Sequence, residues 1–494
     1  MVTVHNTVER LDVEAVNSKE KRKLYATRVK VFPRRIAGLF RALKWWVMGI
    51  TLAIYYITPW LRWDRGPYAP DQAVLIDLAN RRFYFFFIEI WPQEFYYIAG
   101  LLIMAGIGLF LLTSTVGRAW CGYSCPQTVW VDLFLVVERW IEGDRNARIK
   151  LDKATWSPAK IWKRVTKHMI WLVIAMLTGG AWIFYFADAP SLALRLVSFD
   201  APFVAYSTVA ILTATTYIFA GFMREQVCTY MCPWPRIQGA MLDEDSLTVT
   251  YNDWRGEPRR GADAKDGGNA VKQGDCIDCN LCVAVCPQGI DIRDGQQLEC
   301  ISCALCIDAC NEVMERIGKP RGLISYSTLR DYNAHVRGVG SPTTWRSFIR
   351  PRTFIYIALW AAIGLGMIYF LLTRERLDVN VLHDRNPVFV KLSDGSIRNG
   401  FTVKILNMVP EPRSFRLSLS GLPGAVMTMA GRDAPPAASI NIRTEPDRLR
   451  AIRIYVKVDQ DSLKARSTPF VFTVTEVGGD ERADYEARFE APGK

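Results

Sequence analysis

The chain has 494 residues, of which 50% are hydrophobic and 22% are charged, and its formal net charge is +12. At about 150 residues per domain, this length predicts roughly three domains. The apolar residues gather in blocks long enough to cross a bilayer, which excludes a simple soluble enzyme and a disordered chain. In a membrane protein, an excess of Lys and Arg is typical of cytoplasmic loops, so the charge does not indicate binding to nucleic acid.

Residues 1–43 are polar and basic, and they lack the apolar core and cleavage site of a signal peptide. Five later blocks approach the roughly 20 apolar residues that a bilayer core requires. These predicted spans are residues 45–61, 95–113, 168–186, 203–223 and 353–373. Trp and Tyr near the ends of these blocks fit an aromatic belt.

The distribution of positive charge predicts the orientation of the spans. Loops 139–167 and 224–352 are rich in Lys and Arg, whereas loops 62–94 and 187–202 are poorer. Five spans then place the N-terminus in the cytoplasm and the C-terminus outside.

Block 127–141 has apolar residues at helical spacing, but it is short and contains Asp132, Glu138 and Arg139. We interpret it as an interfacial or re-entrant helix rather than a sixth span, which would invert the downstream topology.

From about residue 378, the pattern of apolar and polar residues changes from long apolar blocks to short alternating segments. Residues 401–405 and 452–458 alternate apolar with polar side chains, and residues 469–474 form another strand candidate. Clusters of Gly, Pro and Asp separate them, which predicts an all-β sandwich.

Residues 276–286 and 300–310 each hold four closely spaced Cys, which is typical of bacterial ferredoxins with two clusters. We therefore expect a multi-domain protein with an α-helical membrane bundle, a ferredoxin-like insert and a β-sandwich. The predicted parts are a basic cytoplasmic segment 1–43, a four-span region 44–245, a linker 246–275, a dicluster ferredoxin domain 276–325, a linker 326–352, a fifth span 353–373 and a sandwich 378–494 outside the membrane.

A C-x-x-x-C-P element occurs twice, each time after an apolar block. Residues 120–126 read WCGYSCP, and residues 227–233 read VCTYMCP. Both copies fall on the cytoplasmic side of the predicted topology. We infer two related hairpins, each of which brings a pair of thiols to the inner membrane surface.

Two further segments, residues 276–286 and 300–310, each have the spacing C-x₂-C-x₂-C-x₃-C. One tight loop of this kind can supply three thiolates to a [4Fe–4S] cluster, while the fourth Cys ligates the other cluster. We assign Cys276, Cys279, Cys282 and Cys310 to one cluster, and Cys300, Cys303, Cys306 and Cys286 to the second.

The alternatives for these eight cysteines are structural zinc and disulfides. Zinc sites usually separate two C-x₂-C pairs by a long spacer, and disulfides are rare on a cytoplasmic face. Asn311 stands where Pro commonly follows the last Cys of such a run, but this change removes no ligand. Iron–sulfur clusters pass single electrons, so the protein is expected to transfer electrons at the membrane.

The four membrane-edge thiols are Cys121, Cys125, Cys228 and Cys232. If helical, each pair would share one face, and thiolates favour Cu(I), iron–sulfur clusters or zinc. We interpret them as a metal or redox site, one or two in number, and the alternative is buried structural cysteine. Met223 and Met231 are further soft donors, although packing is the favoured role of Met231.

Four histidines occur in the chain, and only His168 touches an apolar block, where it is expected to end a span. A bis-histidine haem inside the bilayer is therefore close to excluded. Glu89 and Glu94 are expected to be interfacial acids, with a proton role beside a quinone as the alternative.

Several runs of residues follow one another along the chain: IWPQEFYY (90–97), CGYSCPQTVW (121–130), RGEPR (255–259), GDCIDC (274–279), GIDIR (289–293), LEC (298–300) and KPRGLI (319–324). In this order they resemble the FixG/RdxA/CcoG family, whose members are accessory proteins of cbb3-type cytochrome c oxidase assembly in bacteria. The resemblance extends from about residue 20 to the end.

The resemblance implies an inner-membrane protein with two [4Fe–4S] clusters and a periplasmic immunoglobulin-like domain. It also implies a role in reducing Cu(II) to Cu(I) for the oxidase, with the C-x-x-x-C-P cysteines as the groups that handle copper. The implied partners are the bilayer, copper donor and transfer proteins, the cbb3-type oxidase or its assembly factors, and an unknown electron donor. Homo-oligomerisation is left open.

Other functions remain as alternatives. The protein could be a membrane ferredoxin that conducts electrons to another reductase, in which case the four thiols hold another cluster or nothing. It could also be an assembly scaffold whose outer β-domain docks the oxidase. A redox sensor is a weaker alternative, because no output domain is visible.

Overall fold

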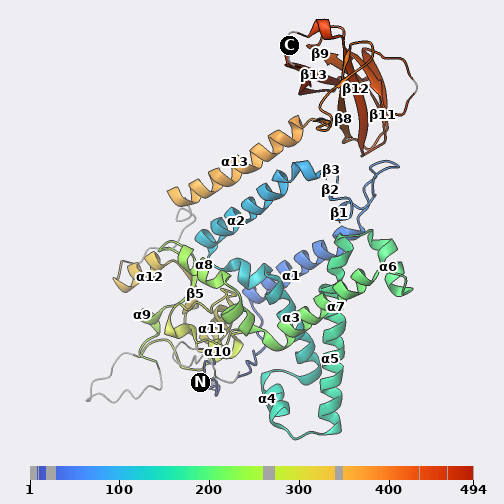
Figure 1. Cartoon of the computed structure of the whole chain (residues 1–494). Helices are drawn as coiled ribbons and strands as arrows, with labels where there is room; N and C mark the ends of the chain where they lie inside the picture. The colour runs from blue at the N-terminus through green and yellow to red at the C-terminus, as the bar shows by residue number, and fades with distance from the viewer. Residues whose placement is uncertain are drawn as a thin grey trace. The chain divides into compact units, whose positions relative to one another are not determined.

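The computed structural model describes Val8, residues 10–17, 29–259, 273–339, 349–432, 434–463 and 465–492. Its contacts divide the chain into two units (Figure 1). The helical unit comprises residues up to Leu61 together with Val74–Asn80 and Glu94–Leu365. The β unit comprises Arg62–Ala73, Arg81–Gln93 and the residues from Gly366 onward.

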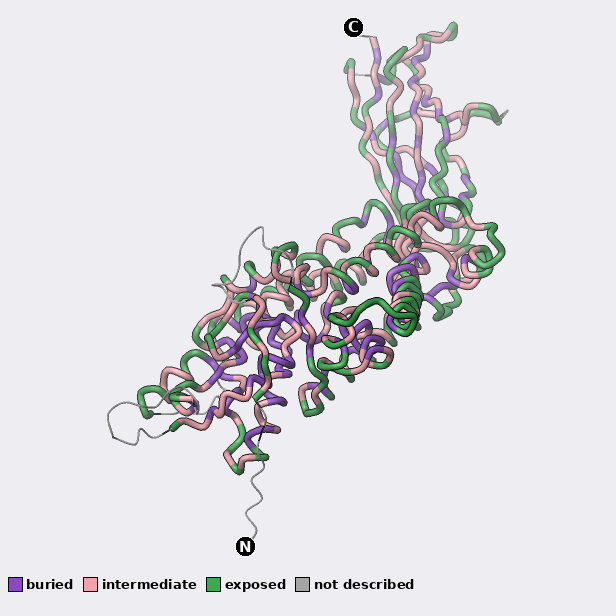
Figure 2. The backbone as a smooth tube through the Cα atoms, turned by 90° about the horizontal axis from the view of Figure 1, so that it is seen from below, coloured by how far each residue is buried: buried purple, intermediate pink, exposed green. Residues whose placement is uncertain are grey.

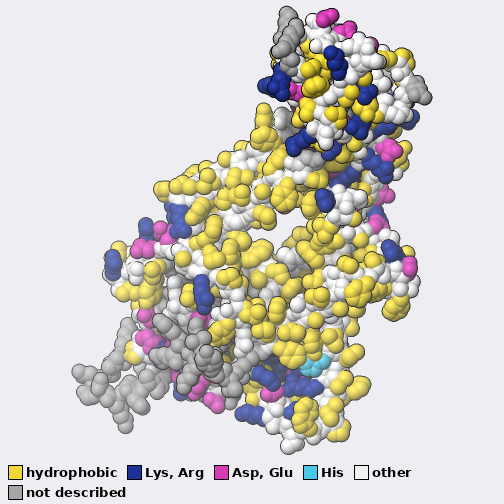
Figure 3. All heavy atoms as spheres, in the orientation of Figure 1, with side chains coloured by type: hydrophobic (Ala, Val, Ile, Leu, Met, Phe, Trp, Pro, Cys, Tyr) yellow, Lys and Arg dark blue, Asp and Glu magenta, His cyan; other side chains and the backbone are white. Residues whose placement is uncertain are grey.

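Four helical segments among the described residues are long and apolar enough to cross a membrane. They are Pro92–Val116, Pro158–Tyr185, Phe203–Met223 and Pro351–Thr373. Their main helices are α2 (Tyr96–Val116), α5 (Pro158–Thr178), α7 (Phe203–Tyr217) and α13 (Pro351–Thr373). These segments coincide with four of the five predicted spans, and hydrophobic side chains cover their visible surfaces in Figure 3.

The remaining predicted span, residues 45–61, falls on helix α1 (Leu39–Ile57), which is not one of these four segments. The reason lies in its first turns, where Arg41 and Lys44 are buried against protein. These two basic residues lower the mean hydropathy of the helix, and the span 45–61 stays a prediction.

Helix α3 (Pro126–Glu142) occupies the ambiguous block 127–141, and it too is absent from the candidate spans. It is amphipathic and buries three carboxylates, which form ion pairs with basic side chains of other segments. Asp132 pairs with Arg41 and Lys44, while Glu138 pairs with Arg148 and Arg224. This pattern fits the predicted interfacial helix. Helices α4 (Arg145–Lys153) and α6 (Ala189–Val197) complete the connections between these long helices.

The cysteine-rich part is a small domain with its own core. Strand β4 (Thr248–Tyr251) pairs antiparallel with β5 (Ile324–Ser327), next to helices α10 (Leu281–Val285) and α11 (Leu305–Arg316). Val249, Val285, Val313 and Ile324 belong to the buried cluster between them. Helices α8 (Trp234–Met241), α9 (Asp253–Gly256) and α12 (Leu329–Val336) flank this domain.

The predicted linkers 246–275 and 326–352 are therefore too wide. Strand β4 and helix α9 occupy the first, and helix α12 occupies part of the second. Backbone pairing of β4 with β5 explains the difference, because short polar strands carry little hydrophobic signal in the sequence. Residues 260–272 and 340–348 of these linkers, and residues 1–7, 9 and 18–28 of segment 1–43, lie outside the described residues.

The β unit contains a two-sheet sandwich. One sheet has the order β10-β12-β8-β6 with β7 also paired to β8, and the other has the order β11-β9-β13-β14. The strands are β6 (Leu377–His383), β7 (Val390–Lys391), β8 (Ile397–Asn407), β9 (Arg413–Ser420), β10 (Val426–Met429), β11 (Ser439–Thr444), β12 (Leu449–Val458), β13 (Ser467–Glu476) and β14 (Arg482–Glu490).

Buried and exposed residues alternate along these strands (Figure 2). The inward side chains from both sheets form one core around Phe401, Phe415, Phe472 and Phe489. The strand candidates 401–405, 452–458 and 469–474 lie in β8, β12 and β13, so the predicted all-β sandwich is confirmed. The unit also contains the antiparallel hairpin of β2 (Arg82–Phe85) and β3 (Ile88–Ile90).

Candidate functional site: two cysteine-lined cavities and four adjacent thiols

The two cysteine-rich loops share one backbone conformation. In the loop before α10, Asp278 and Asn280 have positive φ angles of 52° and 58°. In the loop before α11, Ser302 and Ala304 occupy the corresponding places with φ angles of 54° and 58°. Alternating left-handed residues turn successive backbone N–H groups toward one side, which makes a concave surface suited to an anionic group. The two loops are therefore built as equivalent cradles.

Each cradle encloses one cavity. The first is lined by Cys276, Cys279, Cys282 and Cys310 together with apolar side chains such as Leu323 and Ile324. The second is lined by Cys300, Cys303, Cys306 and Cys286, and also by Cys282. In both cavities, three thiols come from one loop, and the fourth comes from the helix or turn beside the other loop.

The environment of these thiols fits an iron–sulfur cluster. Burial raises the pKa of Cys310 to about 12, and the nearby Cys279 and Cys276 add to the shift. Burial also raises the pKa of Cys286 to about 12, with Cys303 and Cys300 contributing. Thiols in such apolar cavities stay protonated unless a metal replaces the proton, and four clustered thiolates are the usual ligand set of a cubane.

The two C-x-x-x-C-P elements also share one local structure. Helix α2 ends at Gly117, and a π-helical turn, η4 (Trp120–Ser124), leads to Cys125 in an extended conformation. After the fourth span, the π-helical turn η7 (Val227–Met231) leads to Cys232 in the same way. The N–H of Cys125 donates to the carbonyl of Trp120 over 2.9 Å, and that of Cys232 donates to Val227 over 2.8 Å.

This geometry corrects the expectation of two cysteines on one face of an α-helix. The second cysteine of each pair lies just beyond a wider turn, because the following Pro126 or Pro233 starts the next helix. Wide turns of this kind are frequent at functional sites.

The fold brings the two elements together. Burial raises the pKa of Cys228 to about 12, and the thiols of Cys125, Cys121 and Cys232 add to the shift, so all four lie in one neighbourhood. The thiol of Cys121 donates a hydrogen bond to Oε1 of Gln238 over 3.1 Å. Among the described residues, no three Cys, His, Asp or Glu side chains converge on a point that would hold a single ion. The thiols thus neighbour one another without forming a closed ion site.

The first element also contacts the second cysteine cradle. A Cβ atom at Gly122 would lie 2.7 Å from the carbonyl oxygen of Ile301 and 3.1 Å from the Cα atom of Cys303, so only glycine fits there. The hydroxyl of Tyr123 donates to the carbonyl of Cys303 over 3.3 Å. The membrane-edge thiols therefore lie beside the Cys286, Cys300, Cys303 and Cys306 cavity.

Comparison with known proteins matches three parts of the chain to family models. Residues 223–329 match a 4Fe-4S dicluster domain, and residues 98–143 match a 4Fe-4S binding domain. Residues 367–492 match the IG-like fold at the C-terminal of FixG.

Curated relatives match along almost the full length. The chain is 58% identical to nitrogen fixation protein FixG of Rhizobium meliloti, over 99% of this chain and 98% of that protein. It is 54% identical to protein RdxA of Cereibacter sphaeroides, over 93% of this chain and 96% of that protein, and 53% identical to protein RdxB of the same organism, over 95% and 98%. The chain belongs to the FixG/RdxA family.

Membership in the FixG/RdxA family and the 4Fe-4S domains make this chain an iron–sulfur electron-transfer protein with membrane helices. The matched 4Fe-4S dicluster domain begins before η7 and ends after β5. The cysteine cradles and the second C-x-x-x-C-P element therefore belong to one family domain, which is wider than the predicted 276–325.

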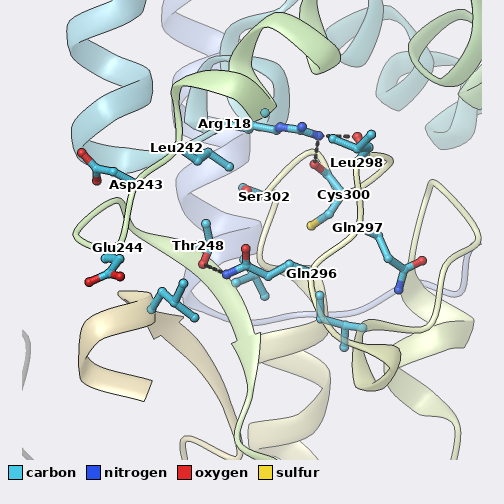
Figure 4. Close-up of a pocket in the computed structure, with 14 residues that line it drawn as sticks. Arg118, Leu242, Asp243, Glu244, Thr248, Gln296, Gln297, Leu298, Cys300 and Ser302 are labelled. Atoms are coloured by element: carbon cyan, nitrogen blue, oxygen red, sulfur yellow. Dashed lines mark hydrogen bonds between the residues drawn. The ribbon is translucent and has the colours of Figure 1, made fainter. Parts of the chain in front are cut away.

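One residue of this FixG/RdxA protein that the sequence did not single out is Arg118. Its buried guanidinium donates to the carbonyls of Leu298 and Cys300 (Figure 4), and to that of Pro235 over 2.6 Å. Burial lowers the pKa of Arg118, while the adjacent Cys300 and Cys121 raise it. This cation thus lies between the second cradle and the membrane-edge thiols. The position of Arg118, a basic residue between an apolar span and the first C-x-x-x-C-P element, is the feature of the sequence that could have indicated this role.

The other candidate residues of this FixG/RdxA protein lie elsewhere. The ring of His168 meets the hydroxyl of Tyr217 at 3.0 Å and stacks on Phe222 in the helical unit. Met231 is half exposed. Glu89 and Glu94 are buried, and Glu89 pairs with Arg82 in the β unit.

Proposed function

We propose that this protein is a membrane-bound cupric reductase that serves the maturation of a cbb3-type cytochrome c oxidase. Its iron–sulfur sites would supply single electrons, and its membrane-edge thiols would present copper as the substrate. The observation that carries the proposal is the contact of Gly122 and Tyr123 with Cys303, because it places the first thiol pair directly against the second cradle.

The proposed ligands follow the two cavities. Cys276, Cys279, Cys282 and Cys310 would hold one [4Fe–4S] cluster, and Cys300, Cys303, Cys306 and Cys286 would hold the other. The cavities are neighbours, since Cys282 lines both of them. Each cluster would supply one electron at a time.

The four membrane-edge thiols would receive the copper. Thiolate ligands stabilise Cu(I) over Cu(II), so a thiol site would favour reduction of bound Cu(II) and would then bind the Cu(I) product more tightly. One electron from the adjacent cradle would convert one Cu(II) to one Cu(I), and the thiols themselves would stay reduced. Gln238 would orient Cys121 through their hydrogen bond, and Arg118 would offset the negative charge of the thiolates on both sides of it.

The test is anaerobic Cu(II) reduction by the reduced full-length protein, followed by EPR as the Cu(II) signal disappears. Replacing Cys121 and Cys125 by Ser, or Cys228 and Cys232 by Ser, should abolish rapid reduction while iron content stays unchanged. Met231→Leu is the matched control, because Met231 is soft, half exposed and next to Cys232. Unchanged rates in both double variants would remove the thiols from the mechanism.

A second candidate function has its own support. The 4Fe-4S binding domain matched to residues 98–143 includes Cys121 and Cys125, so the four thiols could instead hold a further iron–sulfur cluster. The protein would then conduct electrons to another reductase. Iron analysis separates the two, since two clusters require about eight iron atoms per chain and three require about twelve.

We also propose an inner-membrane location, with the dicluster domain cytoplasmic and the β-sandwich periplasmic. The basic loops 139–167 and 224–352 support this orientation. Labelling of single cysteines introduced at exposed positions of the sandwich, in a strain with an intact inner membrane, tests it. Labelling from the cytoplasmic side alone would contradict the proposed orientation.

A further inference from the structure

A basic cavity lies between the first turns of α1 and the outer face of α3, apart from the cysteine cradles. It measures about 600 Å³, and its lining includes three arginines and two tryptophans. These residues are Arg35, Arg41, Arg139, Trp45 and Trp140. No carboxylate lines the cavity, although it adjoins the buried ion pairs of α3.

The positive charge of this cavity is only partly balanced by the described residues. Asp132 pairs with Arg41 over 3.2 Å, but it also pairs with Lys44 over 3.0 Å, so one carboxylate serves two cations. The guanidinium groups of Arg35 and Arg139 form no ion pair with the described residues, and only the backbone N–H of Arg35 meets a carboxylate, that of Asp144. Among the described residues, Arg35, Arg41, Lys44 and Arg139 thus outnumber the nearby carboxylates Asp132 and Asp144.

Arg139 has a buried donor that the described residues do not satisfy. Its buried Nε atom has no hydrogen-bond partner among the described residues, and its Nη2 atom reaches only the carbonyl of Pro33 at 3.5 Å. Burial, together with the nearby Arg148 and Arg41, lowers the pKa of Arg139 to about 10. A phosphate oxygen would satisfy such a guanidinium with charge-assisted, paired hydrogen bonds.

The surroundings of the cavity are those of a membrane interface. Trp140 is 77% exposed and Trp45 is 39% exposed at its edge. Exposed Trp46 and Ile50 continue an apolar surface along α1. Tryptophan at an apolar boundary is typical of the headgroup level of a bilayer, and basic pockets between helices at this level bind acidic headgroups. A free phosphate ion has no apolar part that could contact this edge, whereas a phospholipid has acyl chains.

We propose that this cavity binds the phosphate group of an anionic phospholipid, with Arg35, Arg41 and Arg139 as its ligands and the two tryptophans beside the acyl chains. The N–H groups of Phe40 and Arg41 donate to Asp308 of α11. A lipid at this place would therefore hold the helix that is bonded directly to the cysteine-rich domain. This site is independent of the proposed copper chemistry.

The experiment uses the full-length protein in bilayer discs of phosphatidylcholine with and without phosphatidylglycerol, followed by detergent extraction and measurement of the retained lipid. The wild-type protein should retain phosphatidylglycerol in preference to phosphatidylcholine. Arg35→Gln and Arg139→Gln should each lower this retention about fivefold, as expected from about 1 kcal/mol per basic residue. Arg139→Lys should show an intermediate loss, because lysine keeps the charge without the paired donors.

Lys163→Gln is the matched control, since Lys163 is exposed on α5 and does not line the cavity. An equal loss in this variant would overturn the proposal in favour of general surface attraction. Equal retention of both lipids, or binding of inorganic phosphate at the same residues without lipid selectivity, would overturn it as well. Iron content reports folding, and if Arg139→Gln loses iron, the exposed Arg35→Gln decides the outcome.

Discussion

Gly122 lies against the backbone of Cys303, so closely that a methyl group at Gly122 would lie 2.7 Å from the carbonyl oxygen of Ile301 and 3.1 Å from the Cα atom of Cys303. The two residues join a membrane-edge thiol pair to a cysteine cradle that is far away in the sequence. Close packing of this kind fixes the separation between the thiol pair and the cradle, because neither backbone can move closer or slide past the other.

The first prediction concerns this contact. Gly122→Ala should push η4 away from the cradle, destabilise the protein by about 1–3 kcal/mol and slow Cu(II) reduction. Stopped-flow absorbance and iron analysis measure the two effects. Gly106→Ala is the control, because a methyl group at Gly106 of α2 would meet nothing within 4 Å. Equal rates in both variants would show that the contact does not set electron transfer.

The second prediction concerns Arg118. Arg118→Gln removes a buried cation and its bonds to the carbonyls of Leu298 and Cys300, which should make the adjacent iron–sulfur site harder to reduce. Potentiometric titration followed by EPR measures the shift to more negative potential. Arg118→Lys should restore most of the potential, because it retains the charge. A potential that is the same in all three proteins would argue against an electrostatic role.

The third prediction concerns the buried carboxylate of α3. Burial opposes ionisation of Glu138, but Arg224, Arg148 and Lys167 outweigh it and lower its pKa to about 2. Glu138→Gln would leave Arg148 and Arg224 without a carboxylate, although Lys167 keeps Glu142, and should destabilise the helical unit by about 3–5 kcal/mol. Thermal unfolding measures the change. Glu312→Gln, which removes one exposed ion pair with Arg316, should cost less than about 1 kcal/mol.

The same pKa determines a pH dependence. Because the folded-state value lies below the ordinary value of 4.5, Glu138 contributes stability that is fully present above pH 4.5 and is lost as the pH falls toward 2. The difference between the wild-type protein and Glu138→Gln should therefore shrink on acidification. A constant difference from pH 7 to pH 3 would contradict this assignment.

The fourth prediction concerns the β unit, where Glu89 and Asp447 share Arg82 at 3.2 Å and 3.5 Å. Burial, followed by the charge of Asp447, raises the pKa of Glu89 to about 7. Since this lies above the ordinary value of 4.5, the folded protein takes up a proton between about pH 7 and 4.5 that the unfolded chain does not. The unit is thus destabilised above pH 7, and the cost is relieved as the pH falls.

Glu89→Gln should therefore stabilise the β2–β3 hairpin at pH 8, by up to about 2 kcal/mol, and change it much less at pH 5. Hydrogen–deuterium exchange of the hairpin measures this locally. Glu486→Gln is the control, because Glu486 is exposed on β14. Faster exchange of Glu89→Gln at pH 8 would show that the Arg82 ion pair outweighs the burial of the carboxylate.

The fifth prediction separates the two units. Removal of residues 378–494 takes away a sandwich that has its own core and contains no cysteine. The remaining chain should keep its iron and reduce Cu(II) at a rate within about twofold of the full protein, because all twelve cysteines remain. Loss of oxidase maturation with unchanged reduction would assign docking to the sandwich. Loss of reduction would place part of the electron path in it.

The sequence alone determined the features that depend on local spacing. Apolar length predicted five spans, of which four are the long apolar helices of the structure. Alternation predicted β8, β12 and β13, and the cysteine spacing predicted two equivalent loops. Local order is enough for these features because 3.6-residue and 2-residue periods, and the reach of one loop around a cavity, are properties of short segments.

Only the tertiary structure decided which segments meet. It brought Cys121 and Cys125 to Cys228 and Cys232, placed Gly122 on Cys303, and put Arg118 between them. It also made α1 an apolar helix whose first turns are bound to α3 and α11. Contacts between residues far apart in the chain depend on the packing of whole helices and strands. The periodicity of one segment does not specify which other segment it packs against.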